Sequence, residues 1–256
     1  MTSLQRHRFW DTIMATRFSV MIEAPTGEAD RVHALAEEVF EEIRRLESLF
    51  SRFIEDSEIS QINRLRLGES VRISPETHRC LGMALKAKRL TRGYFDVAYR
   101  SEGVKESQEA FLLLSKPARV RSESDSLQLD LGGIGKGFAL DWSRDILIQY
   151  GYDRALLCAD TSTILALKPP RDDDRGWPVV VETRQGDQEI FLANESISCS
   201  GTSVRRAHIF DTRQRIYKTV HDRCYVRTPS PTLADAFSTA LLVSGEMDWN
   251  AEEPDE

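Results

Sequence analysis

Apolar residues recur at helical spacing in the first half of the chain. Over residues 28–50 they return every three or four positions, which predicts a long amphipathic helix with one buried face. Ser74 and Pro75 have the residue types of an N-cap and a first helical turn, so they predict a second helix, which ends near Gly93. A partly alternating pattern over residues 11–23 predicts a strand before the first helix.

The second half of the chain contains two more helical patterns. Apolar residues four positions apart over residues 138–150 predict a third helix that ends at Gly151. A fourth helix is predicted over residues 232–244, with Thr232 as its cap and Gly245 as its stop.

Short apolar runs between these helices predict strands. Residues 118–121 and 127–131 flank the polar turn SESDS and predict a hairpin. The continuous apolar run 155–167 predicts one strand that is buried on both faces. Further strands are predicted over residues 178–183, 189–193, 196–200, 208–211 and 224–228.

The order of these elements favours an α+β fold. Strands and helices alternate without a regular βαβ rhythm, so we expect mixed or antiparallel sheets packed against helices rather than a doubly wound parallel sheet. We expect a single layered domain over residues 1–256, whose acidic end, about residues 246–256, forms a frayed tail.

Composition narrows the classes of function. A net charge of −7 argues against a protein held to nucleic acid by backbone electrostatics. No apolar run has the length of a signal peptide or of a membrane span, so we expect a soluble, cytoplasmic protein. The four cysteines lack the CxxC spacing of zinc or redox sites, and we expect reduced, mostly buried thiols.

A glycine-rich segment, LDLGGIGKGFALD over residues 129–141, carries the strongest chemical signal. It joins an alternating apolar run to a helix, an arrangement that brings backbone amides and a lysine close to phosphate. The P-loop pattern fails at Asp130 and Gly137, and the dinucleotide pattern GxGxxG fails at Phe138. A purely structural connection with a solvated Lys136 remains the alternative on residue types alone.

The segment DLGGIGKG followed by FALD resembles the central motif of the ApbE-type flavin transferase family. Five other segments resemble the family's motifs in the same order, and six ordered motifs are hard to produce by chance. These segments are MAT at residues 14–16, SLFSRFIEDSEISQIN at 48–63, TRGYFDVAY at 91–99, SG at 200–201 with HIFDTRQ at 208–214, and LADAFSTALLVSG at 233–245.

The resemblance implies an enzyme of phosphoryl transfer. The family splits FAD and moves its FMN half onto a serine or threonine hydroxyl of a target protein, releasing AMP. Such chemistry requires a divalent cation on the pyrophosphate and a group that accepts the hydroxyl proton. We therefore expect FAD as substrate, magnesium as cofactor and a protein bearing the acceptor hydroxyl as partner.

The implied metal ligands are hard oxygens, as magnesium prefers. They are the Asp235 carboxylate, the Thr239 hydroxyl and the Gly133 carbonyl, with Ser238 as a further candidate. Asp235 and Thr239 are four residues apart and lie on one helical face. The alternative is that Asp235 complements the helix dipole and Thr239 bonds its own helix.

The resemblance also implies an FAD site. His208 is expected either to accept the hydroxyl proton or to bind FAD, and Asp235 is the other expected catalytic residue. Phe53 stands where the family usually has tyrosine, so stacking on the isoalloxazine ring is kept and a phenol hydrogen bond is lost. The implied FAD contacts are Met14, Thr16, Phe53, Tyr94, Phe95, Asp96, Asp130, Lys136, Ser200, His208 and Ile209.

Three departures from the family's pattern leave alternatives open. Ala159, Asp160 and Thr161 replace a usual glycine pair on the adenosine side, TSVRRA follows Gly201, and the chain ends soon after Gly245. A shortened or divergent member is therefore possible. It would be a non-catalytic FAD-binding protein, or a metal-dependent pyrophosphatase that splits FAD into FMN and AMP. The acceptor protein and the oligomeric state are not encoded in these motifs.

Overall fold

The computed structural model describes residues 3–104, 108–172, 174–183, 186–201, 210–211, 216–217 and 219–245. The chain divides into two compact units, each assembled from three segments. The first unit comprises Met1–Arg44, Lys136–Cys199 and Tyr225–Ala234, and the second comprises Arg45–Gly135, Ser200–Cys224 and Asp235–Glu256. The single-domain organisation expected from the sequence stays a prediction.

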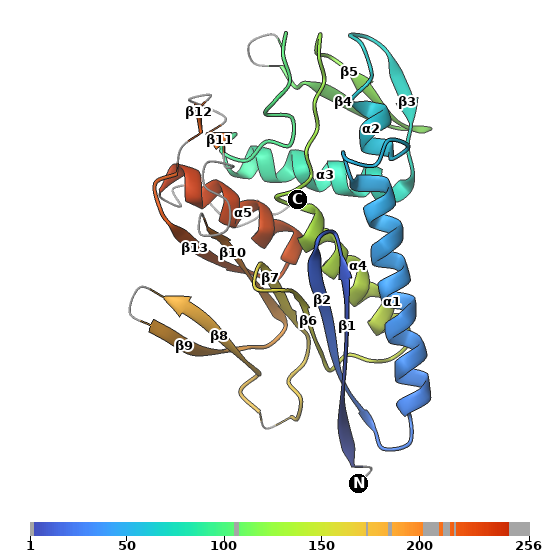
Figure 1. The fold of residues 1–256 in the computed structure, drawn as a ribbon, viewed down its shortest axis with the longest axis vertical. Helices are drawn as coiled ribbons and strands as arrows, with labels where there is room; N and C mark the ends of the chain where they lie inside the picture. Colours follow the sequence, from blue (N-terminus) through green and yellow to red (C-terminus); the bar gives the residue numbers. More distant parts are fainter. Residues whose placement is uncertain are drawn as a thin grey trace. The chain divides into compact units, whose positions relative to one another are not determined.

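A six-stranded sheet forms most of the first unit, with the strand order β1-β2-β6-β7-β10-β13 (Figure 1). The pairings β1–β2, β2–β6, β6–β7 and β7–β10 are antiparallel. The fold is thus mixed α+β with antiparallel sheets, as predicted. The strands are β1 (Leu4–Ile13), β2 (Thr16–Pro25), β6 (Ala155–Ala159), β7 (Thr163–Ala166), β10 (Glu195–Gly201) and β13 (Arg223–Thr228).

Two of the predicted single strands are hairpins instead. The pattern over residues 11–23 belongs to β1 and β2, which turn at Met14 and Ala15 with φ of 53° and 54°. The run 155–167 folds back between β6 and β7, where Asp160 has a φ of 49°. Periodicity missed both turns because neither contains the glycine or proline that usually marks a turn in a sequence.

The first unit has its own apolar core. Strands β8 (Trp177–Thr183) and β9 (Gly186–Leu192) form a separate antiparallel hairpin, and Trp177 is 1% exposed. The Trp177 indole also donates to the Lys168 carbonyl at 2.9 Å. The residues of this core cluster are Leu156, Ala166, Trp177, Val179, Leu192 and Ile197.

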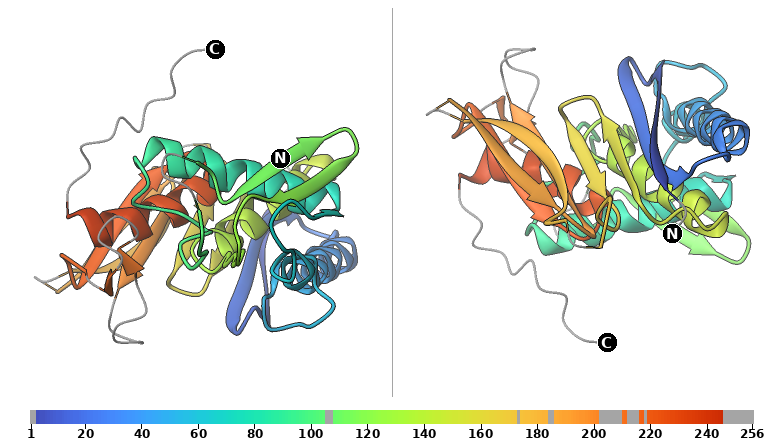
Figure 2. Two further views of the ribbon diagram at one scale, coloured as in Figure 1. Left: turned by 90° about the horizontal axis from the view of Figure 1, so that it is seen from above. Right: turned by 90° about the horizontal axis from the view of Figure 1, so that it is seen from below.

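Helices α1 (Ala29–Phe50) and α4 (Gly135–Gln149) agree with the predicted helices, and their amphipathic faces supply core residues. The β1–β2 hairpin lies beside α1 (Figures 1 and 2). The ring of Phe9 on β1 has its centroid 5.5 Å from that of His33 on α1. After α4, Gly151 has a φ of 85°, the left-handed conformation that ends a helix.

The second unit combines short helices with a three-stranded antiparallel sheet in the order β3-β5-β4. The Ser74 side chain accepts the Thr77 amide at 3.2 Å, which confirms the predicted cap of α3. The remaining elements are α2 (Glu58–Ile62), β3 (Ser70–Arg72), α3 (Pro75–Leu90), β4 (Phe111–Ser115), β5 (Ala118–Ser122), β11 (Phe210–Asp211), β12 (Ile216–Tyr217) and α5 (Pro231–Ser244).

The predicted hairpin around SESDS is wrong. Strand β5 pairs with β4 across the Lys116-Pro117 turn, and residues 127–131 form no strand. The alternation of Leu127, Leu129 and Leu131 reflects burial, since each is at most 4% exposed. Hydrogen bonds to other segments, rather than pairing with a neighbouring strand, hold the backbone of this stretch.

Helix α5 begins one residue earlier than predicted. Ser230, not Thr232, acts as the cap: its hydroxyl accepts the Leu233 amide at 3.3 Å. Pro231 then occupies the first helical position, where its missing amide hydrogen carries no penalty. Among the residues that the structure describes, none of the helices is long and apolar enough to cross a membrane.

Candidate functional site

One face of α5 gathers oxygen atoms in the second unit. Asp235 is 3% exposed and Ser238 is fully buried. The Ser238 and Thr239 hydroxyls donate to the Asp235 carbonyl at 3.0 and 3.3 Å. The Ser200 hydroxyl lies 2.7 Å from that of Ser238 and 3.4 Å from that of Thr239. The predicted residues Ser200, Asp235, Ser238 and Thr239 are therefore neighbours.

The glycine turn approaches this face at Gly133. A Cβ atom on Gly133 would lie 3.1 Å from Thr239 Oγ1 and 3.2 Å from Phe95 Cε2, closer than ordinary van der Waals contact. Glycine at this position thus lets the backbone approach Thr239 closely. The structure brings together two segments that are more than one hundred residues apart in the sequence.

This donor set fits a hard divalent cation. It offers one carboxylate, hydroxyl oxygens and backbone near Gly133, which are the ligand types that magnesium binds. Where Ser238 and Thr239 donate their protons into the helix, their lone pairs remain available as acceptors. Among the residues that the structure describes, no group of three His, Cys, Asp or Glu side chains could hold a metal ion, so a site here relies on neutral oxygens.

A buried thiol lies near the same carboxylate. Burial raises the pKa of Cys80 well above its ordinary value, and the negative charge of Asp235 raises that pKa further. Cys80 is on α3 and is fully buried, so it packs in the core and does not reach solvent.

The segment before the glycine turn is fixed by Asn63. The Asn63 side chain accepts a hydrogen bond from the Leu129 amide at 2.6 Å and donates one to the Leu129 carbonyl at 3.0 Å. It thus makes the two backbone hydrogen bonds that a neighbouring strand would otherwise make. The next amide, of Asp130, donates to the Val97 carbonyl at 2.8 Å. Residues 127–131 are therefore held in an extended path up to the turn.

Both oxygens of the Asp130 carboxylate have partners. One accepts the Gly132 amide at 3.0 Å, and the other lies 3.1 Å from Arg52 Nε. The Arg52 guanidinium also stacks on the Phe53 ring, 4.2 Å from its centroid. Phe53 itself is 81% exposed, so it is not a core phenylalanine.

The TRGYFD segment contributes one buried ring and one carboxylate of a half-buried ion pair. Phe95 is 5% exposed and contacts the Gly133 region, while Tyr94 is partly buried. Asp96 lies 2.9 Å from Lys88 Nζ, and its other oxygen accepts the Ala98 amide at 2.8 Å.

Lys88 serves two carboxylates, Asp96 at 2.9 Å and Glu109 at 2.6 Å. Burial lowers the pKa of Lys88, but the two carboxylates together outweigh burial and raise the pKa above its ordinary value. Lys88 is thus a cation that fixes Asp96 in place.

Three further predicted FAD contacts lie in segments of the first unit. Met14 and Thr16 lie at the β1–β2 turn, and Lys136 is the second residue of α4. Asp160, in the region where the resemblance implies a glycine pair, has a left-handed φ and donates its amide to the Arg17 carbonyl at 2.8 Å. Aspartate tolerates this conformation better than most residues do.

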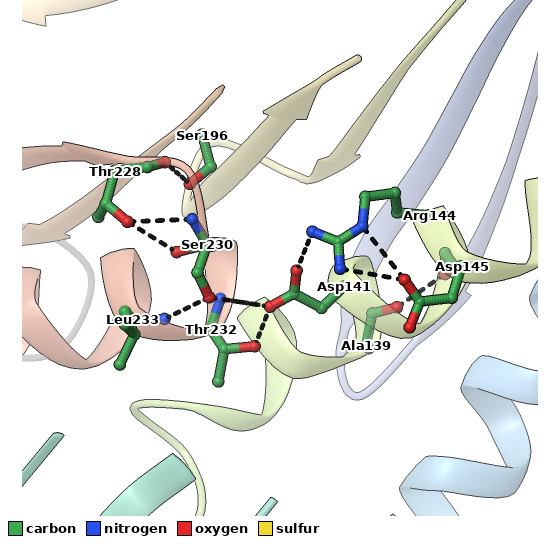
Figure 3. A network of polar contacts seen from close by, with 10 residues as sticks. Ala139, Asp141, Arg144, Asp145, Ser196, Thr228, Ser230, Thr232 and Leu233 are labelled. Carbon is green, nitrogen blue, oxygen red and sulfur yellow. Dashed lines mark hydrogen bonds and ion pairs between the residues drawn. The ribbon is translucent and has the colours of Figure 1, made fainter. Parts of the chain in front are cut away.

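A buried carboxylate organises the start of α5 (Figure 3). Asp141 on α4 is 6% exposed, and its Oδ2 accepts the Ser230 hydroxyl at 3.0 Å and the Thr232 amide at 3.3 Å. The Thr232 hydroxyl donates to the same oxygen, and Arg144 lies 2.6 Å from Oδ1. Negative charge at this position also complements the helix dipole.

The sequence motifs contained two positioning residues that had no predicted role. Asn63 ends the segment SLFSRFIEDSEISQIN, and Arg52 precedes Phe53 in it. Their place inside a matched motif was the available signal. The predicted residues His208 and Ile209, and the arginine pair after Gly201, lie outside the residues that the structure describes.

Comparison with known proteins finds one family. The model of the ApbE family matches residues 14–252. A protein from Rhodobacter capsulatus described as an FAD:protein FMN transferase is 32% identical over 139 residues. That match covers 51% of this chain and 27% of the relative, so the chain corresponds to only part of it.

Solved structures share the fold. A flavinyl transferase ApbE from Pseudomonas stutzeri has a TM-score of 0.81 at 20% identity, covering 94% of this chain and 84% of that one. A flavin transferase ApbE from Vibrio cholerae has a TM-score of 0.79 at 20% identity, covering 94% and 87%. An ApbE protein from Thermotoga maritima has a TM-score of 0.79 at 23% identity, covering 96% and 89%.

Proposed function

The chain belongs to the ApbE family, and we propose that it transfers FMN from FAD to a serine or threonine hydroxyl of a target protein, releasing AMP, with magnesium. The observation that carries this proposal is the approach of Gly133 to the α5 face that bears Asp235 and Thr239. The family motifs supply these residues from the middle and from the C-terminal part of the chain. Both motifs would therefore contribute oxygen ligands to the same metal site.

The proposed metal ligands are Asp235, Thr239 and the Gly133 carbonyl, with Ser238 close by. Magnesium held there would neutralise charge on the pyrophosphate of FAD. Ser200 bridges the two hydroxyls at 2.7 and 3.4 Å and limits their rotation, which favours a preorganised set of donors. A bound cation would offset the negative charge of the buried Asp235 carboxylate.

The proposed reaction moves one phosphoryl group. The acceptor hydroxyl oxygen forms a bond to the FMN phosphorus while the pyrophosphate P–O bond breaks, and the bridging oxygen leaves with AMP. The hydroxyl proton passes to a base, for which we propose His208 because imidazole titrates near neutrality. We propose that Phe53, Tyr94 and Phe95 surround the flavin.

The remaining FAD contacts are proposed on the family resemblance. These contacts are Met14, Thr16, Asp96, Asp130, Lys136, Ser200 and Ile209. The acceptor is a protein rather than a nucleic acid, in keeping with the net charge of −7, and we propose a cytoplasmic location.

The test is product analysis with FAD and magnesium. The protein is incubated with a library of peptides that each carry one serine or threonine, and AMP, free FMN and peptide-bound flavin are measured. Transfer predicts AMP and flavin-labelled peptide in equal amounts. AMP with free FMN and no labelled peptide would instead support a pyrophosphatase. Retention of FAD without AMP release would support a binding protein.

A further inference from the structure

An exposed aromatic ring lies beside the glycine turn with one face covered. Phe53 is 81% exposed, although the Arg52 guanidinium lies 4.2 Å from its centroid. A ring that keeps this exposure while a cation covers one face has its opposite face in solvent. The uncovered face of the ring is therefore available to stack on another planar group.

The backbone around Phe53 is held by several side chains. The Ser57 hydroxyl donates to the Ser51 carbonyl at 2.6 Å and caps α2 through the Ser60 amide at 3.0 Å. Arg64 donates to the Glu55 carbonyl at 2.7 Å. These bonds close the loop on itself, so the ring is presented by a fixed backbone.

Arg52 is fixed from its other side by Asp130. Its Nε lies 3.1 Å from one carboxylate oxygen, and the side chains of both residues are at most about a third exposed, 32% and 21%. The other oxygen of Asp130 accepts the Gly132 amide, which ties the pair to the glycine turn. The guanidinium is therefore oriented by a carboxylate and stacked on a ring at once, a geometry that suits arginine and not lysine.

We propose that Arg52 is a positioning residue for the flavin, holding Phe53 so that its free face stacks on the isoalloxazine ring. This inference rests on the proposed function, which supplies the flavin. Asp130 orients Arg52 through one carboxylate oxygen, while its other oxygen accepts the Gly132 amide. The order of the stack is guanidinium, phenyl ring and isoalloxazine.

The proposal predicts that substitutions at Arg52 weaken the binding of ligands that contain the isoalloxazine ring and leave the binding of AMP unchanged. Arg52→Lys keeps the charge beside Asp130 but removes the planar stacking surface. We expect it to raise the Kd for riboflavin and for FAD by about two- to fivefold, the range of an exposed cation–π contact. The Kd for AMP should not change, because AMP has no isoalloxazine ring.

A double-mutant cycle separates this role from general damage to the fold. Phe53→Ala should raise the Kd for riboflavin by about tenfold, and adding Arg52→Lys to it should have no further effect. Arg121→Lys is the matched control, because Arg121 pairs with Glu123 at 2.7 Å on β5. It should leave all three affinities unchanged, and thermal unfolding of each variant reports whether it is folded.

Several results would overturn the proposal. Unchanged riboflavin affinity in Arg52→Lys, an equal loss of AMP affinity, or a further loss in the Phe53→Ala background would each do so. Failure of the wild-type protein to bind FAD or riboflavin would remove both this inference and the proposed function. Binding of both ligands without AMP release would contradict the transferase alone and leave the stacking result standing.

Discussion

At the scale of single residues, Gly133 explains why the glycine turn matters. Its missing side chain lets the turn approach Thr239 and Phe95, each within 3.2 Å of where a Cβ would lie. Gly135 in the same turn is different, since a Cβ there would meet Leu131 at an ordinary 3.9 Å. The two glycines form a natural comparison.

Gly133→Ala should weaken magnesium binding. The added methyl group pushes Thr239 away, and overpacking of this kind costs about 1–3 kcal/mol, which is about five- to 150-fold in affinity when the whole cost falls on magnesium binding. Isothermal titration with magnesium in the presence of FAD measures the effect. Gly135→Ala should bind magnesium as the wild type does, and equal losses in both variants would argue against the placement of the site at Gly133.

Ala15→Gly should stabilise the protein by about 1 kcal/mol, because Ala15 has a φ of 54° and left-handed backbone disfavours a Cβ. Urea unfolding measures the change. Ala34→Gly on the exposed face of α1 is the control, and it should destabilise by about 1 kcal/mol. If both variants were stabilised, or both destabilised, the effect of Ala15→Gly could not be attributed to the left-handed conformation of the turn.

The positions of individual site residues were predictable only in part. Resemblance implied roles for Gly133, Asp235 and Thr239, which stay predictions, and the structure brings Gly133 close to Thr239. It gave no role to Asn63 or Arg52, because their partners, Leu129 and Asp130, are over sixty residues away in the sequence. A hydrogen bond between such distant residues leaves no periodic signal.

At the scale of elements, α5 depends on a carboxylate from α4. Asp141 accepts bonds from Ser230 and from both the amide and the hydroxyl of Thr232. The sequence placed the cap at Thr232, because cap preference is local and cannot distinguish two nearby hydroxyls. The tertiary contact with Asp141 draws Thr232 away from capping.

Asp141→Asn should destabilise the protein by about 3 kcal/mol, because a buried charged acceptor of several hydrogen bonds is lost. Urea unfolding gives the value. Asp145→Asn is the control, because the Asp145 carboxylate also pairs with Arg144, at 3.0 Å, but is 45% exposed. Its effect should stay below about 1 kcal/mol. Similar losses in both would refute a special role for Asp141.

The predicted elements differ in how well the sequence determines them. The helices and the strands β8, β9, β10 and β13 agree with their predictions because helical spacing and short isolated runs are local signals. The hairpins β1–β2 and β6–β7 were merged into single strands, since Met14, Ala15 and Asp160 give no glycine or proline punctuation. Register between distant strands is not encoded in periodicity.

At the scale of the whole molecule, each compact unit is built from three separate stretches of chain. Composition and periodicity predicted the α+β class but not this division, since both describe local sequence. Residues brought together in one unit, such as Gly133 and Thr239, can therefore be far apart in the sequence.

Stability should fall in mildly alkaline solution. Burial raises the pKa of Cys158 to about 11, so the folded protein keeps a proton that the unfolded chain loses above about pH 9. The stabilisation is complete below pH 9 and is lost as the pH rises toward 11. Between these values the free energy of unfolding should drop by about 2 kcal/mol.

Urea unfolding at pH 8, 9 and 10 checks this dependence. In Cys158→Ala the free energy of unfolding should fall less steeply with pH. The slope should decrease by the contribution of about one proton, because the thiol that titrates is gone. An identical pH dependence in the variant and in the wild type would assign the alkaline loss to other groups.

The central claim is that Asp235 holds the metal that drives FAD cleavage, and AMP release tests it most directly. Wild-type protein and Asp235→Asn are compared with FAD and magnesium, with FAD binding measured in the same samples. We predict magnesium-dependent AMP release by the wild type and a loss of about a hundredfold or more in the variant, with FAD still bound. No AMP from the wild type, or equal release by the variant, would contradict the account.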